Sequence, residues 1–166
     1  MKYLNIHDKK LPIPSFFQVY NYGGGNGDKD REIVYAELTG DTPALVNYYY
    51  INNYYHHTFQ SRYFDDISGF NSVGDLYNYI RSKLIEKGEI YSGYTSEPFD
   101  FNSKVFLLDS GAFNIIKYVA KTANYDVKEF NKRILNDVIK YYEFANALKF
   151  DMVVCFDVGA NYIKVK

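Results

Sequence analysis

The sequence predicts an α/β protein built on a parallel sheet, for three reasons. Residues 105–108 and 152–156 are short apolar runs of the kind found in buried strands. Between them, residues 127–148 have the apolar spacing of a long helix. A strand–helix–strand order makes a βαβ unit, whose strands are parallel and whose crossover is right-handed. An aspartate, Asp109 or Asp157, follows each run at once, as at the functional edge of parallel α/β proteins.

The helix at residues 127–148 has a start signal and a continuous apolar face. Asp126 and Glu129 have the spacing of a capping box, with Asp in place of the usual Ser or Thr. One stripe collects Val127, Phe130, Ile134, Val138, Tyr141, Ala145 and Leu148. These features predict an amphipathic helix.

A second helix is predicted over residues 74–87. Ser72 is its candidate N-cap, and Gly88 is a natural stop. Its apolar face consists of Leu76, Tyr79, Ile80 and Leu84. Residues 89–104 contain Gly, Ser, Pro and Asp and are predicted to form a loop.

The amino-terminal part predicts further β-structure. Residues 1–22 have the character of short strands, broken by the Pro-x-Pro pair at Pro12 and Pro14. A further strand is expected to end near Asn47. The glycine-rich residues 23–30 are predicted to form a plain loop, because no Lys-Ser/Thr pair follows them to complete a phosphate-binding loop.

Composition and charge bound the class of protein. The chain has 166 residues and is 47% hydrophobic, which suits one domain or part of a larger one. It has no apolar run long enough for a membrane span and no apolar leader near its start, so we expect a cytoplasmic protein with no membrane partner. The net charge of −1 predicts no overall basic surface, although 19 Lys and Arg leave room for a local basic face.

Metal-ligating residues are scarce. The single cysteine, Cys155, excludes an internal disulfide and a cysteine-based metal cluster within this chain. Because Cys155 lies in an apolar run, we expect it to be buried. His56 and His57 are adjacent, so on a strand they would point to opposite faces, and no metal site is predicted.

Residues 106–114, "FLLDSGAFN", resemble the Asp-Ser-Gly-Gly-Phe/Tyr-Gln signature of the tRNA-guanine transglycosylases. Residues 150–159, "FDMVVCFDVG", resemble the second signature of that family, a hydrophobic strand ending in Phe-Asp-Glu. The order and separation of the two motifs also fit. Looser likenesses in "KKLPIPSFFQV" and "ALVNYYYI" extend the resemblance over most of the chain.

The resemblance implies a fold of the (β/α)8 TIM-barrel type, of which residues 1–166 would be the amino-terminal portion. It implies exchange of a guanine in tRNA, or in DNA for a related branch, for a 7-deazaguanine. Asp109 matches the acid/base aspartate, and Asp157 matches the aspartate that reads the base edge. The implied substrate-binding set is completed by Ser110, Gly111, Phe113, Asn114 and Asn47, with Phe113 as the stacking aromatic and Asn47 as the weakest match.

The sequence departs from the family at several positions. Ala112 replaces a glycine, Asn114 replaces a glutamine, and Val158-Gly159 replaces Glu-Cys. The nucleophilic aspartate and the Cys/His zinc site of the family match no residue here. We therefore expect no cofactor in this chain, with zinc only in a longer protein. We also expect no base exchange by this chain alone, and a homodimer or a second polypeptide that completes the barrel.

Two other functions are compatible with the sequence. The chain could bind guanine or nucleic acid without catalysis, as a vestigial form of the enzyme. It could instead be an unrelated TIM-barrel hydrolase with two strand-end carboxylates, in which case a metal requirement is expected.

Overall fold

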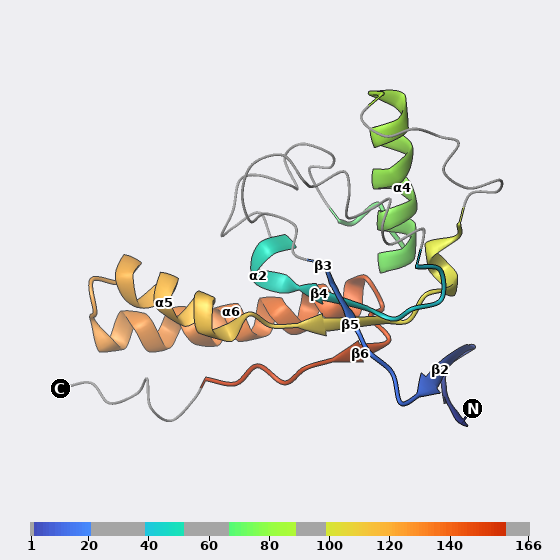
Figure 1. Cartoon of the computed structure of the whole chain (residues 1–166). Helices are drawn as coiled ribbons and strands as arrows, with labels where there is room; N and C mark the ends of the chain where they lie inside the picture. The colour runs from blue at the N-terminus through green and yellow to red at the C-terminus, as the bar shows by residue number, and fades with distance from the viewer. Residues whose placement is uncertain (1, 21–38, 52–66, 89–98, 159–166) are drawn as a thin grey trace.

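A computed structural model describes residues 2–20, 39–51, 67–88 and 99–158 of the chain (Figure 1). The predictions for the glycine-rich residues 23–30, for His56 and His57, and for Gly159 lie outside these ranges.

The centre of the structure is a four-stranded sheet in the order β3-β4-β5-β6. The strands are β3 (Gln18–Tyr20), β4 (Ala44–Asn47), β5 (Phe106–Asp109) and β6 (Met152–Val153). Every neighbouring pair is parallel. The predicted parallel pairing of the two apolar runs is therefore confirmed, and so is the strand that ends at Asn47. Among the described residues the sheet is open, and the predicted barrel stays a prediction.

The crossover between β5 and β6 contains two helices, where the sequence predicted one. The predicted helix is confirmed as α6 (Val127–Ala147), and the side chain of Asp126 accepts a hydrogen bond from the Glu129 backbone N–H. An additional helix, α5 (Ala112–Thr122), starts directly after β5. Figure 1 shows α5 running away from the end of the sheet and α6 returning alongside it.

The predicted helix after Ser72 is confirmed as α4 (Val73–Glu86). Ser72 caps it by accepting from the Asp75 N–H, and Gly88 follows its end at a φ of +69°. The backbone N–H of Val73 also donates to Leu148 O, which joins the start of α4 to the end of α6. Part of the loop predicted at 89–104 is a 3₁₀ turn, η1 (Phe101–Ser103), that packs on α4.

The chain begins with an antiparallel hairpin of β1 (Lys2–Ile6) and β2 (Lys9–Ile13). Pro12 was expected to interrupt the β-structure, but it pairs with Tyr3 inside β2. A proline is tolerated there because the hairpin is a separate two-stranded sheet, so its strands have an outer edge that needs no N–H donor. Figure 1 places the hairpin and α5 at opposite ends of the four-stranded sheet.

The strand predicted over residues 152–156 is much shorter, since β6 ends at Val153. The Val154 N–H still donates to Leu108 O, but two tyrosines of α6 take over the next backbone groups. Tyr141 Oη lies 2.6 Å from Val154 O, and Tyr142 Oη accepts from the Phe156 N–H. The prediction that Cys155 is buried is wrong for this reason: the segment leaves the sheet and its thiol is exposed.

The core lies between the sheet and the helices. It combines the inward residues of β4 and β5 with the apolar faces of α4, α5 and α6. At its centre Tyr48 packs edge-on against Tyr141 and Phe144, with ring centroids 5.3 and 5.1 Å apart. Burial of such apolar and aromatic surface is the main stabilising term. None of the helices in the described ranges has the length and apolar character needed to cross a bilayer.

Candidate functional site

The carboxyl edge of the sheet brings together two of the predicted site residues, Asn47 and Asp109. They face each other in register as the last residues of β4 and β5. Asn47 Nδ2 donates to Asp109 Oδ2 over 2.7 Å. The Tyr49 backbone N–H donates to Asn47 Oδ1 over 3.1 Å, which orients the amide with its NH₂ group toward the carboxylate. Both side chains are half-buried, so the carboxylate is held in place and still reaches solvent.

Gly111 allows the backbone after β5 to pass close to this pair. It has a φ of +62°, in the left-handed region that favours glycine. A Cβ atom at this position would lie 2.5 Å from Asn47 Oδ1 and 2.7 Å from Tyr49 Cβ. Glycine is therefore required at position 111 for two reasons: the backbone has a positive φ, and the neighbouring atoms leave no room for a Cβ. The groups that approach Gly111 closely are side chains of the protein, and the substrate-binding role implied for Gly111 stays a prediction.

The start of α5 positions the next three predicted residues. Ser110 is buried, and its Oγ accepts from the Ala112 N–H over 3.1 Å, so the hydroxyl closes the turn into the helix. Phe113 is 51% exposed. Asn114 is half-buried, and its backbone N–H donates to Gly111 O. Of these three side chains, that of Phe113 is the most exposed, and its predicted stacking role stays a prediction.

The sequence predicted that Asp157 directly follows a strand. In the structure, Asp157 lies four residues after the end of β6, in an extended segment. Its side chain is exposed, while Phe156 is buried and Val158 packs against the core. Leu108 faces Val153 in the register of β5 and β6. Asp157 therefore comes three residues after Val154, the position that would face Asp109 in that register.

Tyr141 holds the ends of β5 and β6 together. Its Oη lies 3.0 Å from Leu108 O and 2.6 Å from Val154 O. Burial raises the pKa of Tyr141, and the nearby charge of Asp109 raises it further. The phenol therefore stays protonated and keeps its donor for these carbonyls. The sequence placed Tyr141 on the apolar stripe of the helix but did not indicate this contact.

A second tyrosine, Tyr49, lies on the other side of the pair. Its backbone orients Asn47 and its Cβ is the close neighbour of Gly111. Burial raises the pKa of Tyr49, with further contributions from Tyr50 and Tyr118. No sequence pattern distinguishes Tyr49 from the other tyrosines around it, because its role depends on the register of β4 against β5.

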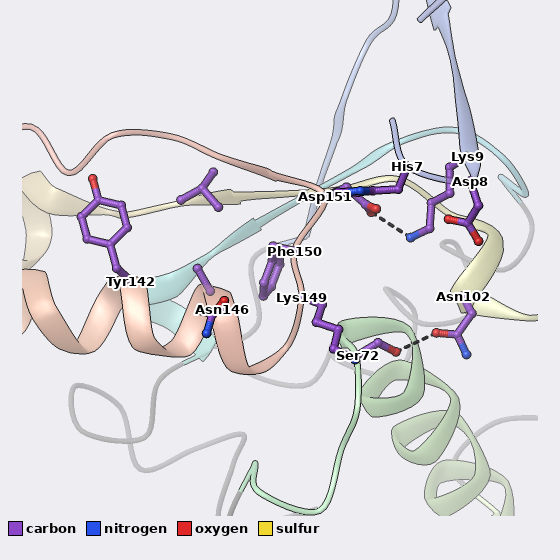
Figure 2. A pocket seen from close by; sticks show the side chains of 12 residues that line it. His7, Asp8, Lys9, Ser72, Asn102, Tyr142, Asn146, Lys149, Phe150 and Asp151 are labelled. Atoms are coloured by element: carbon purple, nitrogen blue, oxygen red, sulfur yellow. Dashed lines mark hydrogen bonds and ion pairs between the residues drawn. The ribbon is translucent and has the colours of Figure 1, made fainter. Parts of the chain in front are cut away.

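A hollow in the described part of the chain lies at the opposite, amino edge of the sheet (Figure 2). Its volume is about 690 Å³. Lys9 and Asp151 both line it, and the Lys9 ammonium lies 2.8 Å from the Asp151 carboxylate, whose same oxygen accepts from the Phe106 N–H. Lys9 also donates to Lys104 O. These bonds join the hairpin to the sheet, and neither Asp109 nor Asp157 lines the hollow.

Metal ligands do not cluster in the described ranges: no three His, Cys, Asp or Glu side chains there lie close enough together to hold an ion. Comparison of the chain with protein-family models, with curated proteins and with solved structures finds no match.

Proposed function

We propose that this chain supplies the guanine-recognising part of a base-exchange transglycosylase that replaces guanine in tRNA or DNA by a 7-deazaguanine. The observation that carries the proposal is the bonded pair of Asn47 and Asp109 at the carboxyl edge of the sheet. Asp157 follows the next parallel strand, β6, in the direction of the same edge. The exposed ring of Phe113 follows Asp109 along the chain.

Asp157 suits the recognition of guanine. Guanine presents two adjacent donors, N1–H and the exocyclic amine, and an ionised carboxylate has two acceptor oxygens and no donor. Adenine presents an acceptor at the matching position, which would face a carboxylate lone pair to lone pair. Because hydrogen bonds to charged groups contribute about 1.5–3 kcal/mol each, the discrimination between these bases can be large. The exposure of Asp157 makes it accessible to a base that has left its stack.

Asp109 suits a proton-transfer role. Asn47 occupies one carboxylate oxygen, Oδ2, and in the described structure Oδ1 has no hydrogen-bond partner. A fixed carboxylate with one accessible oxygen can accept a proton from an incoming base or return one to a leaving base. Exchange also requires a nucleophile that holds C1′ while the bases change places, a role we do not assign to Asp109 or Asp157.

Base recognition is tested by equilibrium binding of free guanine and 7-deazaguanine, with adenine as the competitor. We expect Asp157→Asn to weaken guanine binding at least tenfold, because the amide places a donor against one of the donors of guanine. Asp8→Asn is the matched control: it makes the same chemical change at an exposed carboxylate near the other end of the sheet. Equal guanine affinity in the wild type and the Asp157 variant would refute the assignment.

Catalysis is tested with guanine-labelled tRNA and duplex DNA plus a free 7-deazaguanine. We expect guanine binding without exchange by this chain alone, because neither Asp109 nor Asp157 is assigned as the nucleophile. Release of label with incorporation of the new base would contradict that expectation and make Asp109 the first candidate for the nucleophile. We propose a cytoplasmic location for either activity, because tRNA and unpackaged DNA are found there.

A further inference from the structure

The exposed side of α5 carries two lysines between two aromatic residues. Phe113, Lys117 and Lys121 follow one another at four-residue intervals, and all three side chains are exposed. Tyr125 comes four residues later, just after the helix ends at Thr122, and is 75% exposed. At 1.5 Å per helical residue, the helical part of this line, from Phe113 to Lys121, is about 12 Å long. We refer to these four residues as the α5 stripe.

The charge of the α5 stripe is positive and locally unopposed. The sequence of α5, "AFNIIKYVAKT", contains no acidic residue. Within the described ranges no carboxylate pairs with Lys117 or Lys121. The Lys117 ammonium instead lies 4.0 Å from the centre of the Phe113 ring, a cation–π contact. A cation and an aromatic face are therefore presented side by side at the start of α5.

The far end of the stripe is held in an uncommon conformation. Asn124 and Tyr125 have φ values of +49° and +58°, in the left-handed region that bulky side chains rarely adopt. The Tyr125 N–H donates to Ala120 O over 3.0 Å, and the Asp126 N–H donates to Ala123 O, so the turn is fixed by backbone bonds. These bonds fix the backbone from which the exposed Tyr125 side chain projects, so its Cβ needs no rearrangement when the ring meets a ligand.

We propose that the α5 stripe is the binding track for a single-stranded segment of nucleic acid, with phosphates on Lys117 and Lys121 and bases stacked on Phe113 and Tyr125. Stacking on aromatic side chains combined with a line of cations is how proteins bind single strands without reading their sequence. This inference rests on the proposed function, because α5 starts three residues after Asp109 and leads away from the sheet edge (Figure 1).

The test is fluorescence anisotropy of labelled ten-nucleotide strands over a range of salt concentrations. One strand is oligothymidine and the other carries a single guanine within it. We expect Lys117→Gln/Lys121→Gln to weaken both strands and to reduce the slope of log K against log salt by about 1.4, that is 0.7 for each lost phosphate contact. Phe113→Leu and Tyr125→Leu should each weaken binding about tenfold with the slope unchanged.

The matched control is Lys128→Gln/Lys132→Gln, which removes the same charge at the same spacing from exposed positions on α6. The proposal would be overturned if the control lost as much affinity for the strands as the stripe variants, or if the stripe variants lost none. Tighter binding to anionic lipid vesicles than to either strand would also overturn it. The two proposals fail separately. Loss of guanine preference in Asp157→Asn tests base recognition, whereas the thymidine strand reports on the stripe alone. Thermal melting of each variant confirms that it is folded.

Discussion

Asn47 and Asp109 end two neighbouring parallel strands at the same level, and the amide of Asn47 donates to the carboxylate of Asp109 across 2.7 Å. The Tyr49 N–H fixes the other end of that amide. The side chain of Asn47 thus orients the carboxylate of Asp109 at an edge of the sheet that remains accessible to solvent.

Replacing this amide by an acid should destabilise the protein in a pH-dependent way. In Asn47→Asp two carboxylates face each other, and they repel once both are ionised. We expect the free energy of unfolding to fall by about 1–2 kcal/mol at pH 7.5. We expect a smaller decrease at pH 4.5, where the paired carboxyl groups share a proton and repel less. Urea unfolding at both pH values measures this. Asn47→Ala removes the hydrogen bond without adding charge, so its loss should be the same at both pH values.

Adding a methyl group at Gly111 should cost more than at another glycine of the same conformation. Gly111 and Gly88 have φ values of +62° and +69°, but a Cβ at Gly88 would meet no atom within 4 Å. Gly111→Ala should therefore destabilise the protein by about 1–3 kcal/mol more than Gly88→Ala, since it adds a steric clash to the same backbone strain. Equal values from urea unfolding would show that Asn47 and Tyr49 move aside freely.

Removing the Tyr141 hydroxyl should loosen the junction of β5 and β6. Tyr141→Phe takes away a buried donor that serves Leu108 O and Val154 O, and we expect a loss of about 1–2 kcal/mol in unfolding free energy. Tyr125→Phe, at an exposed position, should change stability by less than about 0.5 kcal/mol. Hydrogen exchange of the Val154 amide should become faster in the first variant and stay unchanged in the second.

Lys104 should make stability rise with pH in the mildly alkaline range. The side chain is fully buried, and its ammonium donates to Thr42 O over 2.8 Å. Burial lowers the pKa of Lys104 to about 8. Between that value and about 10.4, its ordinary pKa, the unfolded chain binds more protons than the folded one, so stability increases as the pH rises.

The variant Lys104→Met lacks this increase of stability with pH. The difference in stability between the wild type and the variant therefore isolates the contribution of Lys104. The stability of the variant relative to the wild type should fall by about 1–2 kcal/mol between pH 7 and pH 9.5. Contributions from the ionisable groups that the two proteins share cancel in the difference. A difference that stays constant with pH would mean that Lys104 remains charged in the folded state throughout this range.

The sequence predicted those elements whose signals are local. The long helix was identified by its apolar stripe and by Asp126, and α4 by Ser72 and its own periodicity. The helix α5 was missed because its N-cap is Gly111, which offers no side chain to cap with. Its buried residues nevertheless have helical spacing, and that spacing was the available signal: Ala112, Ile115, Ile116 and Val119.

Other features depend on contacts that local sequence does not reveal. The run at residues 152–156 is apolar enough for a strand, yet it leaves the ladder at Val154 because hydroxyls from α6 bind its backbone. The exposure of Cys155 follows from the same contacts. The pairing of Asn47 with Asp109 depends on the register of two strands far apart in the chain, so its geometry could be found only in the folded structure.

The bond between Lys9 and Asp151 has a consequence for how the chain folds during synthesis. The two residues are 142 positions apart, so the hairpin emerges from the ribosome long before the carboxylate that anchors it. At synthesis rates of about 5–20 residues per second, this delay is on the order of ten seconds. An isolated two-stranded hairpin is only marginally stable in water. We therefore expect the hairpin to gain its ion-pair anchor late, because Lys9 can bond to Asp151 only after β5 and both crossover helices have been synthesised.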